Sequence, residues 1–342
     1  MNQNMDMFLG CNIINWNDGQ TWVERLTTVF GCKTRIRELH VQFKDYTMLI
    51  KLEALGNLEL TALKISGELG MNYDRRYQVE ILTNAFNGSL STLEEITIGN
   101  KEFSQALQSY SHWTEERKRW GHFNEGKSSR ISTAAFSNLT KLKTVNIGQI
   151  GFTLIDFQAF KNLPELTELN FANYIIHTLE SEAFIDLPAL EYLDLSNQMF
   201  YVIPTRAFYN LINLKQIVLK NNEISTIETK AFEKLPKLEN LDLSELGIQS
   251  ISPEAFYDLP KLTYLNLRDN YLRKMEGNIV HNTPIMTSLD LSTNYRLEYI
   301  GNVLEAVSAN TYVNLTRTKI KTFPEGSFKG FFEKILHNDG EG

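Results

Sequence analysis

Residues 238–267 read LENLDLSELGIQSISPEAFYDLPKLTYLNL, and this stretch decides the fold because it holds one complete unit of a repeat and the start of the next. In LENLDL and LTYLNL apolar residues alternate with polar ones, so that Leu241 and Leu243 point to one face, as in a half-buried β-strand. Leu265 takes the position of Leu241 in the next unit, which sets a 24-residue period. The stretch therefore predicts short strands that recur with this period.

Two apolar columns extend this period along most of the chain. The first apolar position of the strands is taken by Leu39, Leu63, Ile96, Val145, Leu169, Leu193, Ile217, Leu241, Leu265, Leu289 and Val313. A second column, later in each unit, is mostly phenylalanine: Phe160, Phe184, Phe208, Phe232, Phe256, Val280, Leu304 and Phe328. One repeat cannot bury its apolar face alone, so the repeats must stack on one another. We expect a spine of stacked rings, one from each coil.

These columns resemble the leucine-rich-repeat family, in particular its 24-residue extracellular type, L-x-x-L-x-L-x-x-N-x-L. The resemblance implies an α/β solenoid, a horseshoe with a concave parallel β-sheet and irregular or short helical segments on its convex side. It divides the chain into an N-terminal cap over residues 1–35, about eleven repeats over residues 36–331, and a degenerate terminal repeat or tail over residues 332–342.

The sequence departs from this pattern in two places that bear on the structure. The family's asparagine, whose side chain satisfies backbone groups after the strand, survives only as Asn222, Asn270 and Asn294, while Gln198, for example, replaces it elsewhere. Part of the usual hydrogen-bond ladder must therefore be replaced. In the repeat that starts at Met286 the apolar positions shift by one residue, which predicts a local bulge.

Composition excludes some classes of function. The chain has 342 residues, of which 42% are hydrophobic, and a net charge of −7. This acidic balance argues against a general nucleic-acid binder, which needs a basic stripe for phosphates. No apolar run reaches the roughly 18 residues that a membrane span needs. The N-terminal residues lack the features of a signal peptide, so a secreted protein would be numbered from after a removed leader.

Two inserts interrupt the period, at residues 68–78 and 104–128, where the strand column steps from Leu63 to Ile96 and from Ile96 to Val145. Inserts in a solenoid form loops on one face, often the binding face, and aromatic and arginine side chains are common at interface hot spots. We therefore take as candidate partner-binding residues Tyr73, Arg75, Arg76, Tyr110, Trp113, Arg117, Arg119, Trp120 and Phe123. The alternatives are that the rings fold back over the neighbouring surface or that the inserts are disordered.

The concave face is the second candidate surface for a protein partner. Ten strand spacings of about 4.8 Å give a sheet of roughly 48 Å, long enough for an interface of about 800 Å² per partner. Its outward candidates are Glu168, Asn170, Glu191, Tyr192, Asp194, Lys215, Glu239, Asp242, Tyr264, Asn266, Arg268 and Asp290. For any single residue, a solvated surface is the alternative.

Cysteines and glycosylation motifs bear on the compartment. Cys11 and Cys32 form either a disulfide, which would indicate an oxidising compartment, or two unrelated free thiols. Asn87, Asn138 and Asn314 begin N-x-S/T triplets. Together these features favour a secreted or extracellular glycoprotein over a cytosolic scaffold with reduced cysteines.

No pattern of catalytic chemistry is found. The sequence has no nucleotide-binding glycine motif and no serine nucleophile elbow, and the ten-residue separation of His112 and His122 matches no common zinc pattern. We expect no metal, no cofactor and no enzymatic activity. The resemblance to Toll-like and Slit-like ectodomains implies recognition of another protein, and the alternative is a non-catalytic stabilising subunit of a secreted enzyme complex.

Overall fold

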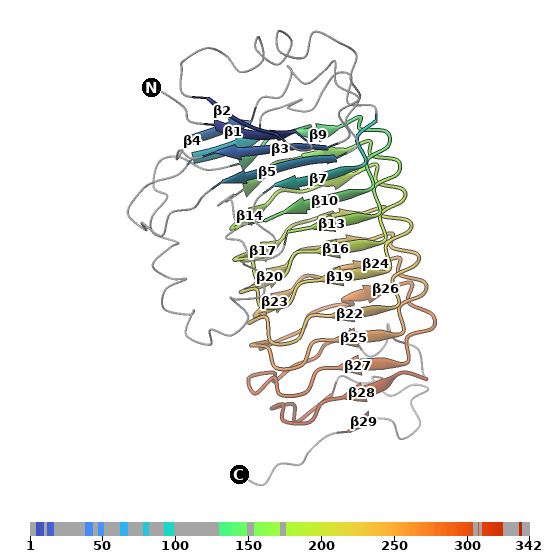
Figure 1. Ribbon diagram of the computed structural model, residues 1–342. Coiled ribbons are helices and arrows are strands. Elements are labelled where there is room, and N and C mark those ends of the chain that lie inside the picture. The colour runs from blue at the N-terminus through green and yellow to red at the C-terminus, as the bar shows by residue number, and fades with distance from the viewer. Residues whose placement is uncertain are drawn as a thin grey trace. The chain divides into compact units, whose positions relative to one another are not determined.

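The computed structural model describes residues 5–9, 12–16, 38–43, 47–50, 62–67, 78–81, 92–98, 130–148, 154–171, 176–303, 307, 310–323 and 335–336. The chain divides into two compact units, Met1–Ile175 and Ile176–Gly342. Within each unit the chain winds into stacked coils, and each coil adds one strand to each of several parallel ladders (Figure 1). Both units are therefore solenoids, as the repeat predicts.

The first unit contains a long sheet that is parallel except at its N-terminal edge. The sheet consists, in order, of β13 (Glu168–Asn170), β10 (Thr144–Ile147), β7 (Glu95–Ile98), β5 (Ala62–Gly67), β3 (Glu38–Phe43), β1 (Met5–Leu9) and β2 (Asn12–Trp16). Leu39 pairs with Leu63, Leu63 with Ile96, and Ile96 with Val145, which confirms the predicted strand column. Strand β1 is antiparallel to both β2 and β3, so this pair covers the edge of the sheet.

Two shorter ladders complete the coils of the first unit. One contains β4 (Thr47–Ile50), β6 (Gln78–Ile81), β8 (Arg130–Ile131) and β11 (Leu154–Ile155). The other contains β9 (Phe136–Ser137) and β12 (Phe160–Lys161). Apart from Gln78, which begins β6, the two inserts lie outside the described residues. In sequence, the inserts fall between β5 and β6 and between β7 and β8, that is, after two consecutive strands of the long sheet.

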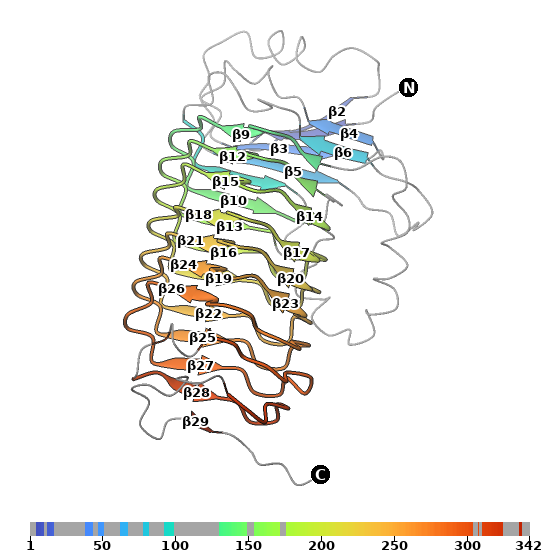
Figure 2. The same cartoon turned by 180° about the vertical axis from the view of Figure 1, so that it is seen from behind.

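The second unit repeats the same three ladders. Its sheet strands are β16 (Tyr192–Asp194), β19 (Gln216–Val218), β22 (Asn240–Asp242), β25 (Tyr264–Asn266), β27 (Ser288–Asp290), β28 (Tyr312–Asn314) and β29 (Ile335–Leu336). The second ladder has β14 (Thr178–Leu179), β17 (Val202–Ile203), β20 (Thr226–Ile227) and β23 (Ser250–Ile251). The third has β15 (Phe184–Ile185), β18 (Phe208–Tyr209), β21 (Phe232–Glu233), β24 (Phe256–Tyr257) and β26 (Val280–His281). Figure 2 shows the second and third ladders from behind.

The return segments differ in detail from the expectation of irregular or short helical structure. In the described residues the named elements are all strands, and those of the return segments are two residues long in nearly every coil. In the two-residue strands of the second ladder the second residue points inward and the first is at least partly exposed, as in Ser250–Ile251, where Ile251 is buried and Ser250 exposed. The return side is therefore built from short β-ladders.

The predicted spine of rings is present in the core of each unit. Phe136 and Phe160 stack at 4.6 Å between ring centroids. In the second unit Phe208 lies 5.1 Å from Phe232, and Phe232 lies 5.5 Å from Phe256. All of these side chains are fully buried. Aromatic pairs at these separations contribute about 0.5–1.5 kcal/mol beyond their area burial, so the spine stabilises the contact between successive coils.

Each regular coil turns at three residues with positive φ, a feature that the sequence analysis did not identify. In one coil of the second unit these residues are Asn221 (φ 59°), Lys230 (φ 54°) and Lys234 (φ 57°). At the turn after the phenylalanine, the same position holds Asn162, Asp186, Asn210, Asp258 and Asn282 in other coils. Asparagine and aspartate tolerate this backbone region better than other non-glycine residues. The recurring N-L or D-L after the phenylalanine is the signal that could have predicted these turns.

Buried amides join successive coils in the second unit. The Asn270 side chain donates to the carbonyl oxygens of Leu243 and Leu267, and its Oδ1 accepts the backbone N–H of Ile248 at 2.9 Å. Gln198, fully buried at the equivalent position, donates to the Ser196 carbonyl and accepts the N–H of Ile176. A glutamine thus replaces the asparagine in the ladder, as the sequence requires.

Candidate functional site

The outward residues of the six strands from β16 to β28 form one polar surface of the second unit, which we call the sheet face. Alternation fixes its composition: in Tyr264–Asn266 the central leucine is fully buried and its two neighbours are partly exposed. In register, Tyr264 lies between Asn240 and Ser288, and Asn266 lies between Asp242 and Asp290. Ten of the twelve candidates lie in this unit; Glu168 and Asn170 lie on the equivalent strand β13 of the first unit.

The aspartates of the sheet face also have a structural role. Oδ1 of Asp194, Asp242 and Asp290 accepts the backbone N–H of the residue two positions on, at 2.8, 3.0 and 2.8 Å respectively. This local bond stabilises the turn that follows the strand. The recurring D-L-S in the sequence could have predicted these turns.

Asparagine performs the same turn function in the same column. Asn266 Oδ1 accepts the N–H of Arg268 at 3.0 Å, and Asn314 Oδ1 accepts the N–H of Thr316 at 3.1 Å. The turn after the strand therefore needs a side-chain Oδ1 as hydrogen-bond acceptor but no negative charge. The charges of Asp242 and Asp290 are additional to what the fold requires.

Tyr264 lies close to three charged side chains of the sheet face, those of Asp242, Asp290 and Arg268. Partial burial raises the pKa of its hydroxyl, the negative charges of Asp290 and Asp242 raise it further, and the guanidinium of Arg268 opposes them. The Tyr264 phenol is therefore protonated, close to the negative charges of two carboxylates on the neighbouring strands. Tyr312, 37% exposed and paired with Ser288, extends the surface by one coil; it was not among the candidates, although alternation about Val313 places it at the position of Tyr264.

Other candidates on the sheet face neutralise one another. Lys215 Nζ lies 2.8 Å from Glu191 Oε2, and both side chains are about half exposed, so this pair contributes little to stability. The Tyr192 hydroxyl donates to Asp194 Oδ2 at 3.4 Å. Glu239 and Arg268 are exposed. The part of the face around Tyr264 is thus where unneutralised carboxylates and an aromatic ring coincide.

The remaining predicted site residues are only partly within the described chain. Cys11, Cys32, Asn87 and all nine insert candidates lie outside the described residues. Asn138 is exposed, and its Oδ1 accepts the amide of Asn162 at 2.7 Å. Asn314 is partly buried, and its amide donates to Asp290 at 3.4 Å. Of the two, Asn138 is the more accessible to a glycan.

Two further observations concern the described residues alone. They contain no group of three or more histidine, cysteine, aspartate or glutamate side chains placed to hold a metal ion. Among them, no helix has the length and apolar character needed to traverse a bilayer.

Comparison with known proteins identifies the repeat. The family described as BspA type leucine rich repeat region, in six copies, matches residues 122–222, 177–303 and 225–333. These matches together span more than half of the chain. The chain belongs to this family. Leucine-rich-repeat proteins generally mediate protein–protein interaction. The match confirms the leucine-rich-repeat resemblance, and the more specific 24-residue extracellular type stays a prediction.

Solved structures of leucine-rich-repeat proteins are more distant from this BspA-type chain. The Toll–Spatzle complex of Drosophila contains a chain with 18% identity and a TM-score of 0.48, covering 80% of this chain and 37% of that chain. InlP of Listeria monocytogenes has 18% identity and a TM-score of 0.43, covering 86% of this chain and 69% of that chain. This chain thus spans little more than a third of that matched chain. No curated protein matches the sequence.

Proposed function

We propose that the protein binds another protein through the sheet face of the second unit, with Tyr264 at the centre of the contact. Tyr264 carries the proposal: it is a partly buried phenol on β25 whose pKa is raised by Asp242 and Asp290 on the two neighbouring strands and lowered by Arg268. Tyrosine and arginine are enriched at interface hot spots, where burial on binding strengthens each polar contact.

The charges indicate the chemistry of the partner. Asp242 and Asp290 each use Oδ1 for the turn, Asp290 Oδ2 accepts the Asn314 amide at 3.4 Å, and the negative charges of both aspartates are additional to these bonds. Two carboxylates separated by one strand suit a pair of lysine or arginine side chains. The partner therefore presents basic residues around an aromatic or polar centre.

An extracellular location extends this proposal. It is supported by the spacing of Cys11 and Cys32, by the accessible triplet at Asn138, and by the aromatic and arginine content of the insert at residues 104–128. The insert would add a second contact in the first unit. Thiol titration before and after denaturation tests the pairing of the cysteines: no free thiol is expected, and two free thiols would contradict a disulfide.

Site-specific photocrosslinking tests the sheet face directly. A photoreactive phenylalanine analogue replaces Tyr264 or Tyr312 on the sheet face, or Tyr201, which directly precedes strand β17 of the second ladder. Each variant is irradiated in fluid from the native source. We expect the same covalent adduct from positions 264 and 312 and none from position 201, because only the first two lie in the contact. An adduct of equal yield from position 201, or none from position 264, would rule the proposal out.

A further inference from the structure

A second surface of unusual composition lies on three successive coils of the second unit. It consists of the exposed side chains of residues 271–277, 295–302 and 319–322, the part of each coil that leads from the sheet turn along the second ladder. We call it the basic–tyrosine face. Its exposed aromatic residues are Tyr271 (57%), Tyr295 (56%) and Tyr299 (42%).

The charge of this face differs from that of the same segments one to three coils earlier. Residues 199–205, 223–229 and 247–253 contain no lysine or arginine, and their charged residues are Glu223 and Glu228. The basic–tyrosine face has five basic side chains and two acidic ones, Glu276 and Glu298. The basic residues are Arg273, Lys274, Arg296, Lys319 and Lys321. In a chain with a net charge of −7, this local excess of positive charge is not a general property of the surface.

The basic side chains are available to a ligand. All five are exposed, and within residues 176–303 and 310–323 none of them forms an ion pair. The guanidinium of Arg296 lies 6.0 Å from the ring centroid of Tyr271, so charge and ring surface are presented together.

The backbone of the solenoid is irregular at the same place. Lys274 bridges to Tyr299, whereas the regular repeat that pairs Leu265 with Leu289 in the sheet would bring it to Glu298. Met275 N–H donates to the Tyr299 carbonyl at 2.9 Å. This is the one-residue shift that the sequence predicts. Gly277 and Gly301 both have positive φ, and a Cβ on Gly301 would lie 2.7 Å from the Met275 carbonyl oxygen.

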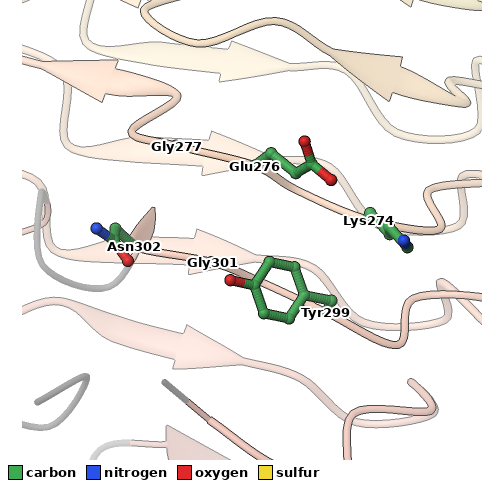
Figure 3. A pocket seen from close by; sticks show the side chains of 6 residues that line it. All are labelled: Lys274, Glu276, Gly277, Tyr299, Gly301 and Asn302. Atoms are coloured by element: carbon green, nitrogen blue, oxygen red, sulfur yellow. The ribbon is translucent and has the colours of Figure 1, made fainter. Parts of the chain in front are cut away.

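The shift and the glycines accompany a hollow between the two coils. It has a volume of about 500 Å³ and is lined by Lys274, Glu276, Gly277, Tyr299, Gly301 and Asn302. Figure 3 shows Lys274 and Glu276 on one coil and Tyr299 and Asn302 on the next. Departures from a regular pattern concentrate at functional sites, and here the shift, the hollow, the tyrosines and the basic residues coincide.

We propose that the basic–tyrosine face binds an acidic segment of a protein partner. Tyrosines offer large contact areas at low entropic cost, the lysines and arginines are complementary to carboxylates, and the hollow can receive one side chain of the segment. The sheet face around Tyr264 carries the opposite charge, so the two faces select different partners. The proposal is independent of the proposed function of the sheet face.

Fluorescence anisotropy with a labelled peptide of eight glutamates, flanked by Gly-Ser, tests this proposal. The charge variant is Arg296→Gln/Lys319→Gln, and the aromatic variant is Tyr295→Ser. The control, Lys237→Gln/Lys261→Gln, removes the same charge at exposed positions outside the face. At moderate salt we expect a loss of affinity of at least tenfold for the charge variant, about fivefold for the aromatic variant, and less than twofold for the control. Circular dichroism checks that each variant is folded.

Four results would overturn the proposal. If the control loses as much affinity as the charge variant, the binding is general electrostatic attraction. If Tyr295→Ser binds like the wild type, or the wild type does not bind the peptide, the face is not a peptide site. If heparin, an anionic polysaccharide, binds more tightly than the peptide and displaces it, the occupant is a glycan and not a protein segment.

Discussion

The second unit contains regular coils, from Tyr192 to Tyr257, and irregular coils, from Tyr264 to Phe323. In the regular coils, strands of the second and third ladders pair at equivalent positions of successive repeats, and the outward residues of the second ladder are small, such as Thr226 and Ser250. In the irregular coils one bridge that is shifted by a single position replaces the second ladder, and tyrosines and basic residues occupy its surface. The regular coils are organised around stacking, whereas the irregular coils give up part of that order where exposed aromatic and charged residues gather.

We expect the largest difference between regular and irregular coils in the free energy of unfolding, when a side chain of the spine is truncated. Phe232→Ala removes a fully buried ring that lies between Phe208 and Phe256, and we expect a loss of about 3–5 kcal/mol in the free energy of unfolding. Val280→Ala, at the same position of the next irregular coil, removes two methyl groups and should cost about 2 kcal/mol. Urea denaturation measures both values. Equal losses would mean that the phenylalanine spine has no special role in the regular coils.

The next largest difference is expected in the thermal stability of two glycine-to-alanine variants, one in each kind of coil. Gly301→Ala in an irregular coil places Cβ 2.7 Å from a backbone oxygen at φ 51°, whereas Gly247→Ala in a regular coil meets its nearest atom at 3.9 Å at φ 83°. Both substitutions carry the cost of a left-handed conformation, about 1–2 kcal/mol, and only Gly301→Ala adds a clash. Thermal unfolding should therefore show a clearly lower midpoint for Gly301→Ala than for Gly247→Ala. The reverse order would contradict the close approach of the two irregular coils.

The smallest expected effect is on the pH dependence of stability, through His177 in the first coil of the second unit. Burial lowers the pKa of His177 below its usual value. When the pH falls below about 6.5, the unfolded chain takes up a proton at this residue before the folded chain does, so the free energy of unfolding decreases. His177→Gln should show a smaller decrease between pH 7.5 and pH 5 than the wild type, in parallel urea titrations. An unchanged pH dependence would show that His177 is not buried enough to matter.

The sequence predicted the parts of the fold that depend on spacing. Leu241, Leu265 and Phe232 occupy their expected columns because the stacking of identical coils requires a constant period. The antiparallel strand β1 was not predicted, because its pairing with β2 and β3 depends on contacts between segments that share no repeat. The turn residues could have been found from the recurring asparagine and aspartate after the phenylalanine.

The candidate sites were predicted less completely. Alternation placed Tyr264, Asp242 and Asp290 on the outer surface of the sheet, but it gave no indication that the aspartates also hold the following turns. Tyr271 and Tyr295 were not among the candidates, because their exposure depends on how the shifted coil packs. Spacing locates a surface, and only the three-dimensional arrangement shows which of its charges are free to bind.

The central claim is that the aspartates of the sheet face hold turns with one oxygen and recognise a partner with their charge. Asp242→Asn/Asp290→Asn separates the two roles, since Asn266 and Asn314 already hold the same turn in the neighbouring strands. Glu223→Gln/Glu298→Gln removes two negative charges away from the sheet face and serves as the control. The measurement is the dissociation constant for the crosslinked partner by calorimetry, with the thermal midpoint of each variant. We predict an unchanged midpoint and at least tenfold weaker binding for the asparagine pair, with the control unaffected; wild-type affinity in the asparagine pair would contradict the account.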